Sequence, residues 1–347
     1  MTVQKGAIGR DTFGRVLRAL APVGLALLVG ALVLAVTGHD PLSFYQLLLR
    51  EAVGDVDRVA ATLAAATPLL FTGLATALCF RAGVFNLGVE GGFLLGGLTS
   101  AVVATQLTGP GPVVAVLAML AGAAVGVGVV AIPAVLRARW SVDEVVVTLM
   151  LNFVAAGLAS WLVTSFLQAP GVANSATPMI PGDVWLPQLL PANGLTLGFL
   201  IGLALVGGYA AWIRGSVRGY ELRQAGLDQR FAAAQGIRVS HVVLLVMLVA
   251  GAIAGLGGAV HALGTVHRFV EGFSPGYGFT GIAVALLGRN SALGVTLGAL
   301  FFGAMSSAGA TIQLFDDIPL DIVDVLSGTV MIFAVARLTV RRRRSRP

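Results

Sequence analysis

A single carboxylate, Glu90, lies in a glycine-rich stretch between two long apolar runs, GVFNLGVEGGFLLGG at residues 83–97. A carboxylate that faces lipid in the middle of a membrane costs roughly 2.5–3.5 kcal/mol on insertion scales, so we expect it to face a cavity, a subunit interface or a polar partner. It could bind an ion, line a path for a polar solute, or accept hydrogen bonds from free backbone amides. Asn86 lies four residues earlier, and this spacing predicts that both polar side chains share one helix face.

The same stretch carries three glycines at every fourth position, Gly88, Gly92 and Gly96. Small residues at this spacing form a groove along one helix face, where a neighbouring helix can approach closely. We predict that the chain enters this helix through an irregular turn around Gly83. Irregular backbone at membrane depth is tolerated only beside protein or water, so the turn must have polar partners.

A second polar stripe follows in WSVDEVVVTLMLN, residues 140–152, where Glu144, Thr148 and Asn152 recur at every fourth position. Ser141 and Glu144 match a capping box, which predicts a helix start for Glu144. Thr148 and Asn152 lie deeper in the apolar run. They either bond a neighbouring helix or line a path for a polar solute.

These patterns define a set of candidate site residues that combines amide, hydroxyl, carboxyl and aromatic groups. The set is Phe85, Asn86, Glu90, Thr148, Asn152 and Tyr277. The four histidines show no metal-ligand spacing, no nucleophile and base lie together, and no G-x-x-x-x-G-K-[ST] phosphate loop occurs. We therefore predict no metal site, no enzymatic activity and no cofactor bound by this chain.

The composition indicates that these residues lie on membrane-spanning helices. Hydrophobic residues make up 57% of the 347 and charged residues 11%, whereas roughly a quarter of the residues in soluble domains are charged. Apolar runs of about 20 residues, the length that crosses a bilayer as a helix, recur along the chain. We predict an all-α polytopic membrane protein with about ten spans, near 17–37, 59–80, 88–107, 112–136, 143–167, 194–213, 240–263, 278–288, 292–311 and 319–338.

Basic residues fit this count when both chain ends are cytoplasmic. Of the 22 lysines and arginines, all but Arg50, Arg58 and Arg268 then fall on inner segments, as the positive-inside rule requires. Ten spans divide into two sets of five, and an odd number in each half predicts inverted repeats. The segments 83–97 and 274–288 occupy comparable places in the two halves, and the short span 278–288 predicts a broken or re-entrant helix.

Two connecting segments have recognisable local chemistry. In the predicted cytoplasmic stretch 214–240, Asp228 can cap a short helix, QRFAAAQ, that Gly236 ends. A helix of two turns is marginal alone, so it needs a surface on which to dock; the alternative is a solvated basic loop. Residues 169–193 contain five prolines and no basic residue, which predicts a rigid external loop that either covers helix ends or docks an outside partner.

Four segments together resemble a known family. FNLGVEGGFLLGG, DEVVVTLMLNFVAAGL, AGLDQRFAAAQGI and GFSPGYGFTGIAVALLGRNSALG follow one another in the order and spacing of the membrane permease subunits of ATP-binding-cassette (ABC) importers for nucleosides and simple sugars. The resemblance covers roughly residues 60–310 and is strongest to the branch associated with basic-membrane-protein lipoprotein receptors.

The resemblance implies one transmembrane permease domain over residues 1–347, in a bacterial cell membrane, with a cytoplasmic N-terminus at 1–16 and a basic cytoplasmic tail at 339–347 that contacts lipid. It implies a second permease subunit, identical or homologous, two cytoplasmic ATP-binding subunits that hold ATP and Mg²⁺, and an extracytoplasmic substrate-binding lipoprotein, with no nucleic-acid partner. The segment within 214–240 would then couple to the ATPase through Gly226, Leu227, Asp228, Arg230, Phe231, Ala233 and Gly236.

The expected substrate is a nucleoside or a related small polar solute. One alternative is the permease of a simple-sugar or branched-chain amino-acid ABC importer, which shares the machinery. Another is an ion-coupled secondary transporter that uses Glu90 as its ion or proton site.

Overall fold

The computed structural model describes residues 24–25, 27–36, 40–140, 142–172, 174–190 and 194–315, together with residues 325, 328, 329 and 332. The described chain is mostly helical, as predicted. It divides into two compact units, one from Asp55 to Ala304 and one formed by the parts of the chain on either side. The predicted cytoplasmic ends 1–16 and 339–347 lie outside the described residues.

The unit Asp55–Ala304 carries the candidate residues. Its first half contains α3 (Val56–Arg81), α4 (Val89–Gln106), α5 (Gly111–Trp140), α6 (Glu144–Leu162) and the π-helix η1 (Val163–Leu167) that continues α6. Its second half contains the 3-10 helix η2 (Gly182–Val184), β1 (Gln188–Leu190), β2 (Leu195–Thr196), α7 (Leu197–Gly215), α8 (Val217–Leu227), α9 (Gln229–Ala234), α10 (Val239–His261), the π-helix η3 (Ala262–Val266), α11 (Tyr277–Leu287) and the start of α12 (Ala292–Phe315). The strands β1 and β2 pair antiparallel.

The other unit includes the apolar helix Leu27–Val36 and α2 (Pro41–Val53). Asp40 caps α2 by accepting hydrogen bonds from the amides of Leu42 and Ser43. The Ser43 hydroxyl also donates to this carboxyl, and this bond together with the two amide bonds lowers the pKa of the exposed Asp40, because all three stabilise its charged form.

Six helices of the described chain are long and apolar enough to cross a membrane. They are Val56–Arg81, Gly111–Trp140, Glu144–Leu167, Leu197–Gly215, Val239–Val266 and Ala292–Gln313. The predicted spans 88–107 and 278–288 correspond to α4 and α11, which are not among the six. The last predicted span, 319–338, falls almost wholly outside the described residues. A multi-pass architecture is therefore present, while the count of ten and the inverted repeats stay predictions.

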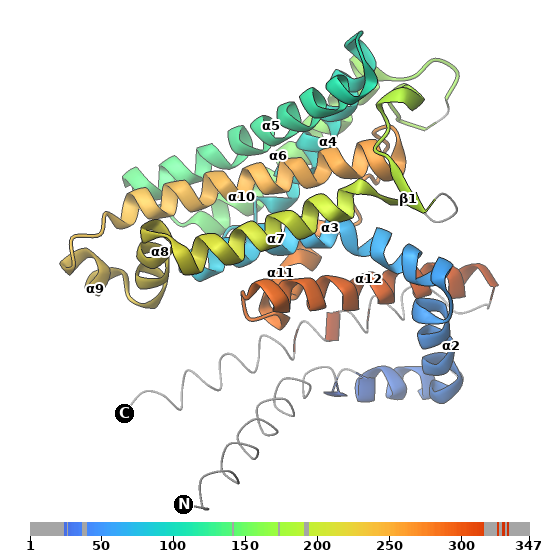
Figure 1. Cartoon of the computed structure of the whole chain (residues 1–347), viewed down its shortest axis with the longest axis horizontal. Helices are drawn as coiled ribbons and strands as arrows, with labels where there is room; N and C mark the ends of the chain where they lie inside the picture. The colour runs from blue at the N-terminus through green and yellow to red at the C-terminus, as the bar shows by residue number, and fades with distance from the viewer. Residues whose placement is uncertain are drawn as a thin grey trace, which may run out of the picture. The chain divides into compact units, whose positions relative to one another are not determined.

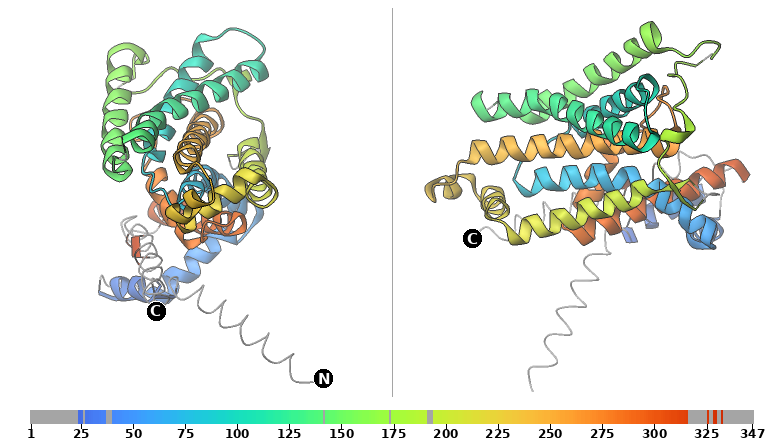
Figure 2. Two further views of the ribbon diagram at one scale, coloured as in Figure 1. Left: turned by 90° about the vertical axis from the view of Figure 1, so that its left-hand side faces the viewer. Right: turned by 45° about the horizontal axis from the view of Figure 1, so that its top comes forward.

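Within the larger unit, α5, α10 and α7 run along a common direction, with α8 and α9 at one end and β1 at the other (Figure 1). The helix α6, drawn in light green, lies at the edge of this group, where it packs on α4 and α5 (Figure 2). Most of its side chains are not covered by this chain, including Phe153, which is 68% exposed.

Glycines bring α4, α5 and α10 into backbone contact. A Cβ on Gly96 would lie 2.5 Å from the Cα of Gly255, and a Cβ on Gly251 would lie 2.5 Å from the carbonyl oxygen of Gly126. A Cβ on Gly255 would meet the carbonyl oxygen of Gly122. Helices in lipid gain little from burying apolar surface, so close backbone packing of this kind is a main source of their association.

This packing predicts that Gly255→Ala destabilises the protein, because its new methyl group meets backbone rather than a flexible side chain. Gly207→Ala on α7 is the matched control, since a Cβ there has nothing within 4 Å. Alanine is favoured over glycine in a helix by about 1 kcal/mol, so Gly207→Ala should leave the thermal unfolding midpoint in detergent unchanged or raise it. Equal midpoints for the two variants would contradict the backbone contact.

Candidate functional site

The turn between α3 and α4, residues 82–88, is irregular, as predicted. Asn86 is fully buried in this turn; its Oδ1 accepts a hydrogen bond from the amide of Gly88 at 2.8 Å, and its Nδ2 donates to Cys79 Sγ at 3.7 Å. Because α4 begins only at Val89, the prediction that Asn86 and Glu90 share a helix face is wrong. Asn86 instead stabilises the break in the helix.

The same boundary corrects the predicted glycine ridge. Gly88 precedes α4 as its N-cap and lies beside Thr148 of α6, so it does not belong to a helical groove. Gly92 and Gly96 are helical and face the small residues of α5 and α10. The backbone contact described above is therefore made by the later part of the glycine series.

The polar stripe of α6 satisfies the backbone of this turn. Glu144, Thr148 and Asn152 are each at least nine-tenths buried and point at the turn and the first residues of α4. The hydrogen bonds run from Phe85 N to Glu144 Oε1 at 3.3 Å, from Leu87 N to Thr148 Oγ1 at 3.1 Å, from Gly91 N to Asn152 Oδ1 at 2.9 Å, and from Asn152 Nδ2 to Leu87 O at 2.8 Å. Of the two predicted roles for Thr148 and Asn152, these hydrogen bonds fit contact with a neighbouring segment, here the turn and the start of α4.

Glu144 also forms an ion pair with the end of α5. Its Oε2 lies 3.2 Å from Nε of Arg137, at the end of α5. The N-cap of α6 is Asp143, which accepts a hydrogen bond from the amide of Val145 at 2.9 Å, so the prediction of a capping box from Ser141 to Glu144 is wrong. Ser141, the other half of the predicted capping box, lies outside the described residues.

Glu90 connects α4 to α11. Its Oε2 accepts a hydrogen bond from the amide of Gly278 at 2.6 Å, and the hydroxyl of Ser274 lies beside its carboxylate. A Cβ on Gly278 would lie 2.6 Å from the amide nitrogen of Glu90, so only glycine permits this approach. Each helix N-terminus carries partial positive charge, and the carboxylate lies in the first turn of α4 while bonding the first turn of α11. We call Glu90, Ser274 and Gly278 the Glu90 junction.

The two aromatic candidates lie apart. Tyr277 belongs to a buried ring cluster, with centroids 5.5 Å from Phe93 and 5.3 Å from His261. Phe85 is 43% exposed and stacks on Phe80 at 4.6 Å. The structure thus gathers Asn86, Thr148 and Asn152 around the turn and places Tyr277 beside the junction, with Phe85 at the surface.

A contact that the sequence did not indicate lies at the end of α10 remote from α9. Residues 175–180 of the proline-rich loop pair with residues 267–271, which follow η3. The backbone bonds are Glu271 N to Ser175 O at 2.9 Å, Thr177 N to Phe269 O at 2.9 Å and Ile180 N to His267 O at 2.8 Å. Sequence patterning missed this pairing because the two segments are about 90 residues apart and neither alternates like a strand.

His267 closes this contact. It adopts a left-handed backbone conformation with φ 58° and stacks on Trp185 at 3.8 Å between ring centroids. Burial lowers the pKa of the His267 imidazole, because it disfavours the charged form. The loop is therefore attached to the segment that leads into α11 and the Glu90 junction.

The opposite end of α10 carries the short helix predicted in QRFAAAQ, and α9 confirms it. Asp228 accepts hydrogen bonds from the amides of Arg230 at 2.8 Å and Phe231 at 3.1 Å, and Gly236 follows with φ 83°. Leu227 is 80% and Phe231 56% exposed. An exposed leucine and phenylalanine next to a capped helix are typical of a surface that a partner covers.

This end also contacts the irregular turn. A Cβ on Gly226 would meet the carbonyl oxygen of Arg81, and a Cβ on Gly83 would lie 3.4 Å from the Cα of Gly226. The guanidinium of Arg81 donates to the carbonyl oxygen of Asn290 at 3.0 Å, in the turn after α11. A displacement of α8 and α9 would therefore reach the residues that precede α4.

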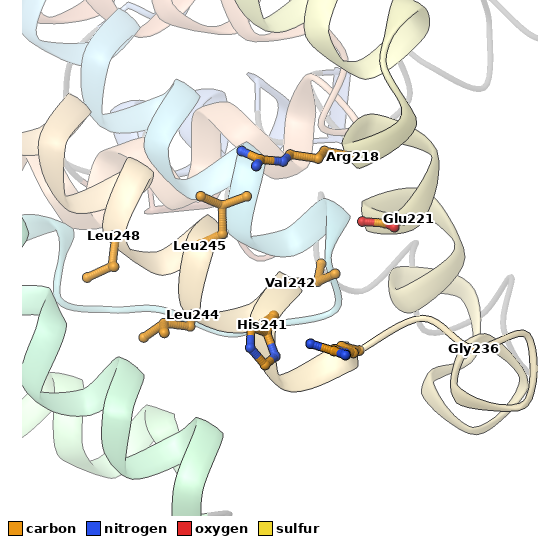
Figure 3. Close-up of a pocket in the computed structure, with 9 residues that line it drawn as sticks. Arg218, Glu221, Gly236, His241, Val242, Leu244, Leu245 and Leu248 are labelled. Atoms are coloured by element: carbon orange, nitrogen blue, oxygen red, sulfur yellow. The ribbon is translucent and has the colours of Figure 1, made fainter.

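A pocket of about 490 Å³ lies between α8 and the first turns of α10 (Figure 3). Arg218 and Glu221 of α8 form its charged wall, and Leu245 and Leu248 form part of its apolar wall. Within the part of the chain that the structure describes, no three His, Cys, Asp or Glu side chains are grouped to hold a metal ion.

A model of the permease component of branched-chain amino acid transport systems matches residues 58–335. The chain belongs to this permease family. The guanosine ABC transporter permease protein NupP of Bacillus subtilis (strain 168) is 34% identical over 330 residues, 93% of each chain. The glucose ABC transporter permease protein TsgB13 of Haloferax volcanii is 33% identical over 92% of this chain and 87% of its own length.

A third relative, the nucleoside ABC transporter permease protein NupB of Lactococcus lactis subsp. cremoris, is 30% identical over 94% of this chain and 92% of its own length. No solved structure matches the chain. The predicted identity as an ABC transporter permease, a multi-pass membrane protein and not itself an enzyme, is confirmed. In this permease, α8 contacts the turn before α4 through Gly226, and the proline-rich loop pairs with the segment before α11.

The Glu90 junction predicts different outcomes for two substitutions. Glu90→Gln keeps an acceptor for the amide of Gly278, so the permease should express normally and transport should fall modestly. Glu90→Ala leaves buried donors without a partner, at about 1–3 kcal/mol, and should lower both the unfolding midpoint and uptake. Uptake that needs an ion gradient and no ATP, and that Glu90→Gln abolishes, would contradict the structural role.

Proposed function

We propose that the permease forms the path by which an ATP-driven importer carries nucleosides, or closely related small polar solutes, into the cell. Its similarity to a guanosine permease over 93% of both chains is the observation that carries this proposal. The similarity to the nucleoside permease NupB over nearly the same length adds to it. The branched-chain amino acid system named by the family model is an alternative substrate class.

A simple sugar is the second candidate substrate, because TsgB13 is nearly as similar as NupP. Nucleosides and sugars both present ring hydroxyl groups, and a nucleoside carries an aromatic base in addition. The ion-coupled alternative finds no support, since these relatives are ABC transporter permeases and the Glu90 carboxylate accepts a hydrogen bond from the backbone of α11.

In this proposal α9 docks on the ATPase. The exposed side chains of Leu227 and Phe231 support a covered surface, and the cap at Asp228 holds a helix too short to persist alone. The pocket beside α8 is lined in part by Gly236, which follows α9. The proposed coupling residues remain Gly226, Leu227, Asp228, Arg230, Phe231, Ala233 and Gly236.

Movement of α9 would reach the membrane interior through Gly226. This glycine contacts Arg81 at the start of the irregular turn, and the turn leads directly into α4 and Glu90. The proposed substrate path lies near this turn. The side chains of Asn86, Thr148 and Asn152 bond the backbone of the turn, so they shape the path and do not offer free polar groups to the solute. The junction then passes the movement on to α11.

The remaining partners follow from the same machinery. Two ATP-binding subunits, which hold ATP and Mg²⁺, would contact the α9 end, and a second permease subunit would complete the path. An extracytoplasmic lipoprotein would dock on the proline-rich loop at the opposite end. With α9 facing the cytoplasm of a bacterial cell, both chain ends are cytoplasmic, as the basic residues predict.

The proposed docking helix can be tested by blocking its surface. Ala233 is exposed, so Ala233→Trp should fold and insert normally but prevent α9 from seating. The ATPase should then fail to co-purify, and reconstituted vesicles should show no substrate-dependent ATP hydrolysis. Ala233→Ser, which changes size little, is the control. Wild-type ATPase association and uptake in Ala233→Trp would remove this segment from the mechanism.

The substrate class can be decided by competition. Uptake of radiolabelled adenosine or guanosine in cells that carry the complete transporter should be suppressed by other unlabelled nucleosides and not by ribose, glucose or leucine. Suppression by glucose or ribose alone would move the permease to the sugar class, and suppression by leucine alone would move it to the amino-acid class. A strain that lacks only this permease measures the background uptake.

A further inference from the structure

A cavity of about 230 Å³ lies between the outer half of α6 and the segment that joins η3 to α11. It opens along α6, where Ala156 and Ser160 are exposed. Its polar and aromatic lining comes from three separate parts of the chain. These residues are Ser160, Ser175, Phe269, Glu271, Phe273 and Ser274.

Two phenylalanine rings line one side of the cavity. The rings of Phe269 and Phe273 stack on each other with centroids 4.8 Å apart and an angle of 26° between their planes. Both side chains are at least nine-tenths buried, so packing holds their positions. Flat aromatic bases stack on such rings without regard to their hydrogen-bonding edges.

The polar side supplies groups suited to sugar hydroxyls. Glu271 is exposed at the cavity while its backbone amide is fixed by the carbonyl oxygen of Ser175 at 2.9 Å. An ionised carboxylate has two acceptor oxygens, which suits a pair of neighbouring hydroxyl groups, and serine hydroxyls both donate and accept. Among the described residues that line the cavity there is one acid and no basic side chain, which disfavours a phosphorylated ligand.

We propose that this cavity is a nucleoside subsite within the permease, with the base against Phe269 and Phe273 and the ribose hydroxyls at Glu271 and Ser160. The inference rests on the proposed function and assigns that substrate class a place in the chain. The cavity is smaller than the roughly 300–1,000 Å³ of pockets for drug-sized ligands, and its opening along α6 leaves room for a nucleoside to extend beyond it. The candidates chosen from sequence patterns, Glu90, Thr148 and Asn152, do not line it.

The subsite is directly connected to the Glu90 junction. Ser274 lines the cavity, accepts hydrogen bonds from the amides of Gly276 at 3.3 Å and Tyr277 at 3.0 Å, and lies beside the Glu90 carboxylate. A hydroxyl group of the solute that bonds Ser274 competes with one of these contacts. Occupation of the cavity therefore acts on the start of α11.

The experiment uses the complete transporter, reconstituted in vesicles, and photoactivatable 8-azidoadenosine as the probe. Illumination should attach the probe within residues 269–274 or near Ser160, as peptide mass spectrometry locates it, and excess adenosine should prevent labelling. Glu271→Ala should reduce labelling and raise the adenosine concentration for half-maximal uptake about tenfold, since one lost strong hydrogen-bonding group has this effect. Ser160→Ala should act in the same direction and less.

Two matched substitutions outside the cavity serve as controls. Thr164→Val removes an exposed hydroxyl in η1, and Phe166→Leu replaces an exposed ring. Both should label and transport like the wild type, whereas Phe273→Leu should lower labelling by the base.

Two results would overturn the subsite, and they are distinguishable. If the wild type takes up nucleosides but labelling lies elsewhere, or Glu271→Ala and Ser160→Ala label and transport normally, the subsite is wrong and the proposed function stands. If the wild type takes up glucose but no nucleoside and shows no labelling that adenosine prevents, both are wrong.

Discussion

The arrangement of this permease depends on one constraint: backbone amides exposed by a break in a helix at membrane depth must find hydrogen-bond partners inside the protein. The turn 82–88 and the start of α11 are both such breaks. The first is satisfied by the polar stripe of α6 and by Asn86, and the second by Glu90 and Ser274. These few polar side chains therefore fix how α4, α6 and α11 meet, because the amides that they bond have no water molecules as alternative partners at this depth.

The glycines of α4, α5 and α10 complement this polar framework. Their backbone contacts hold three helices at a separation that side chains would prevent, while the broken ends remain the places where irregular backbone can change shape. Rigid helices joined through a few irregular segments are suited to a protein that must open alternately to two sides of a membrane, as transporters built on broken helices do.

A continuous series of contacts links the two ends of the larger unit. It runs from α9 through Gly226 to the turn before α4, through Glu90 to α11, and through Ser274 to the segment paired with the proline-rich loop. Substitutions at Gly226, Glu90 and Ser274 therefore test whether the proposed ATPase and the proposed receptor act on the same element.

The sequence by itself determined the class, the family, the irregular turn around Gly83 and the capped helix at Asp228, because hydropathy, charge and capping are properties of neighbouring residues. It also predicted that Glu90 faces protein or water and not lipid, since an unpaired carboxylate in the membrane interior is costly. Only the tertiary structure decided that Asn86 lies in the turn and that Glu144, Thr148 and Asn152 bond the backbone of this turn. It also decided that the amide of Gly278 donates a hydrogen bond to Glu90, 188 residues away. The cavity of Phe269, Glu271 and Ser160 also depends on tertiary structure, because its walls come from segments with no shared periodicity. Pairings between distant segments depend on how helices pack in three dimensions, and no local pattern of residues records that.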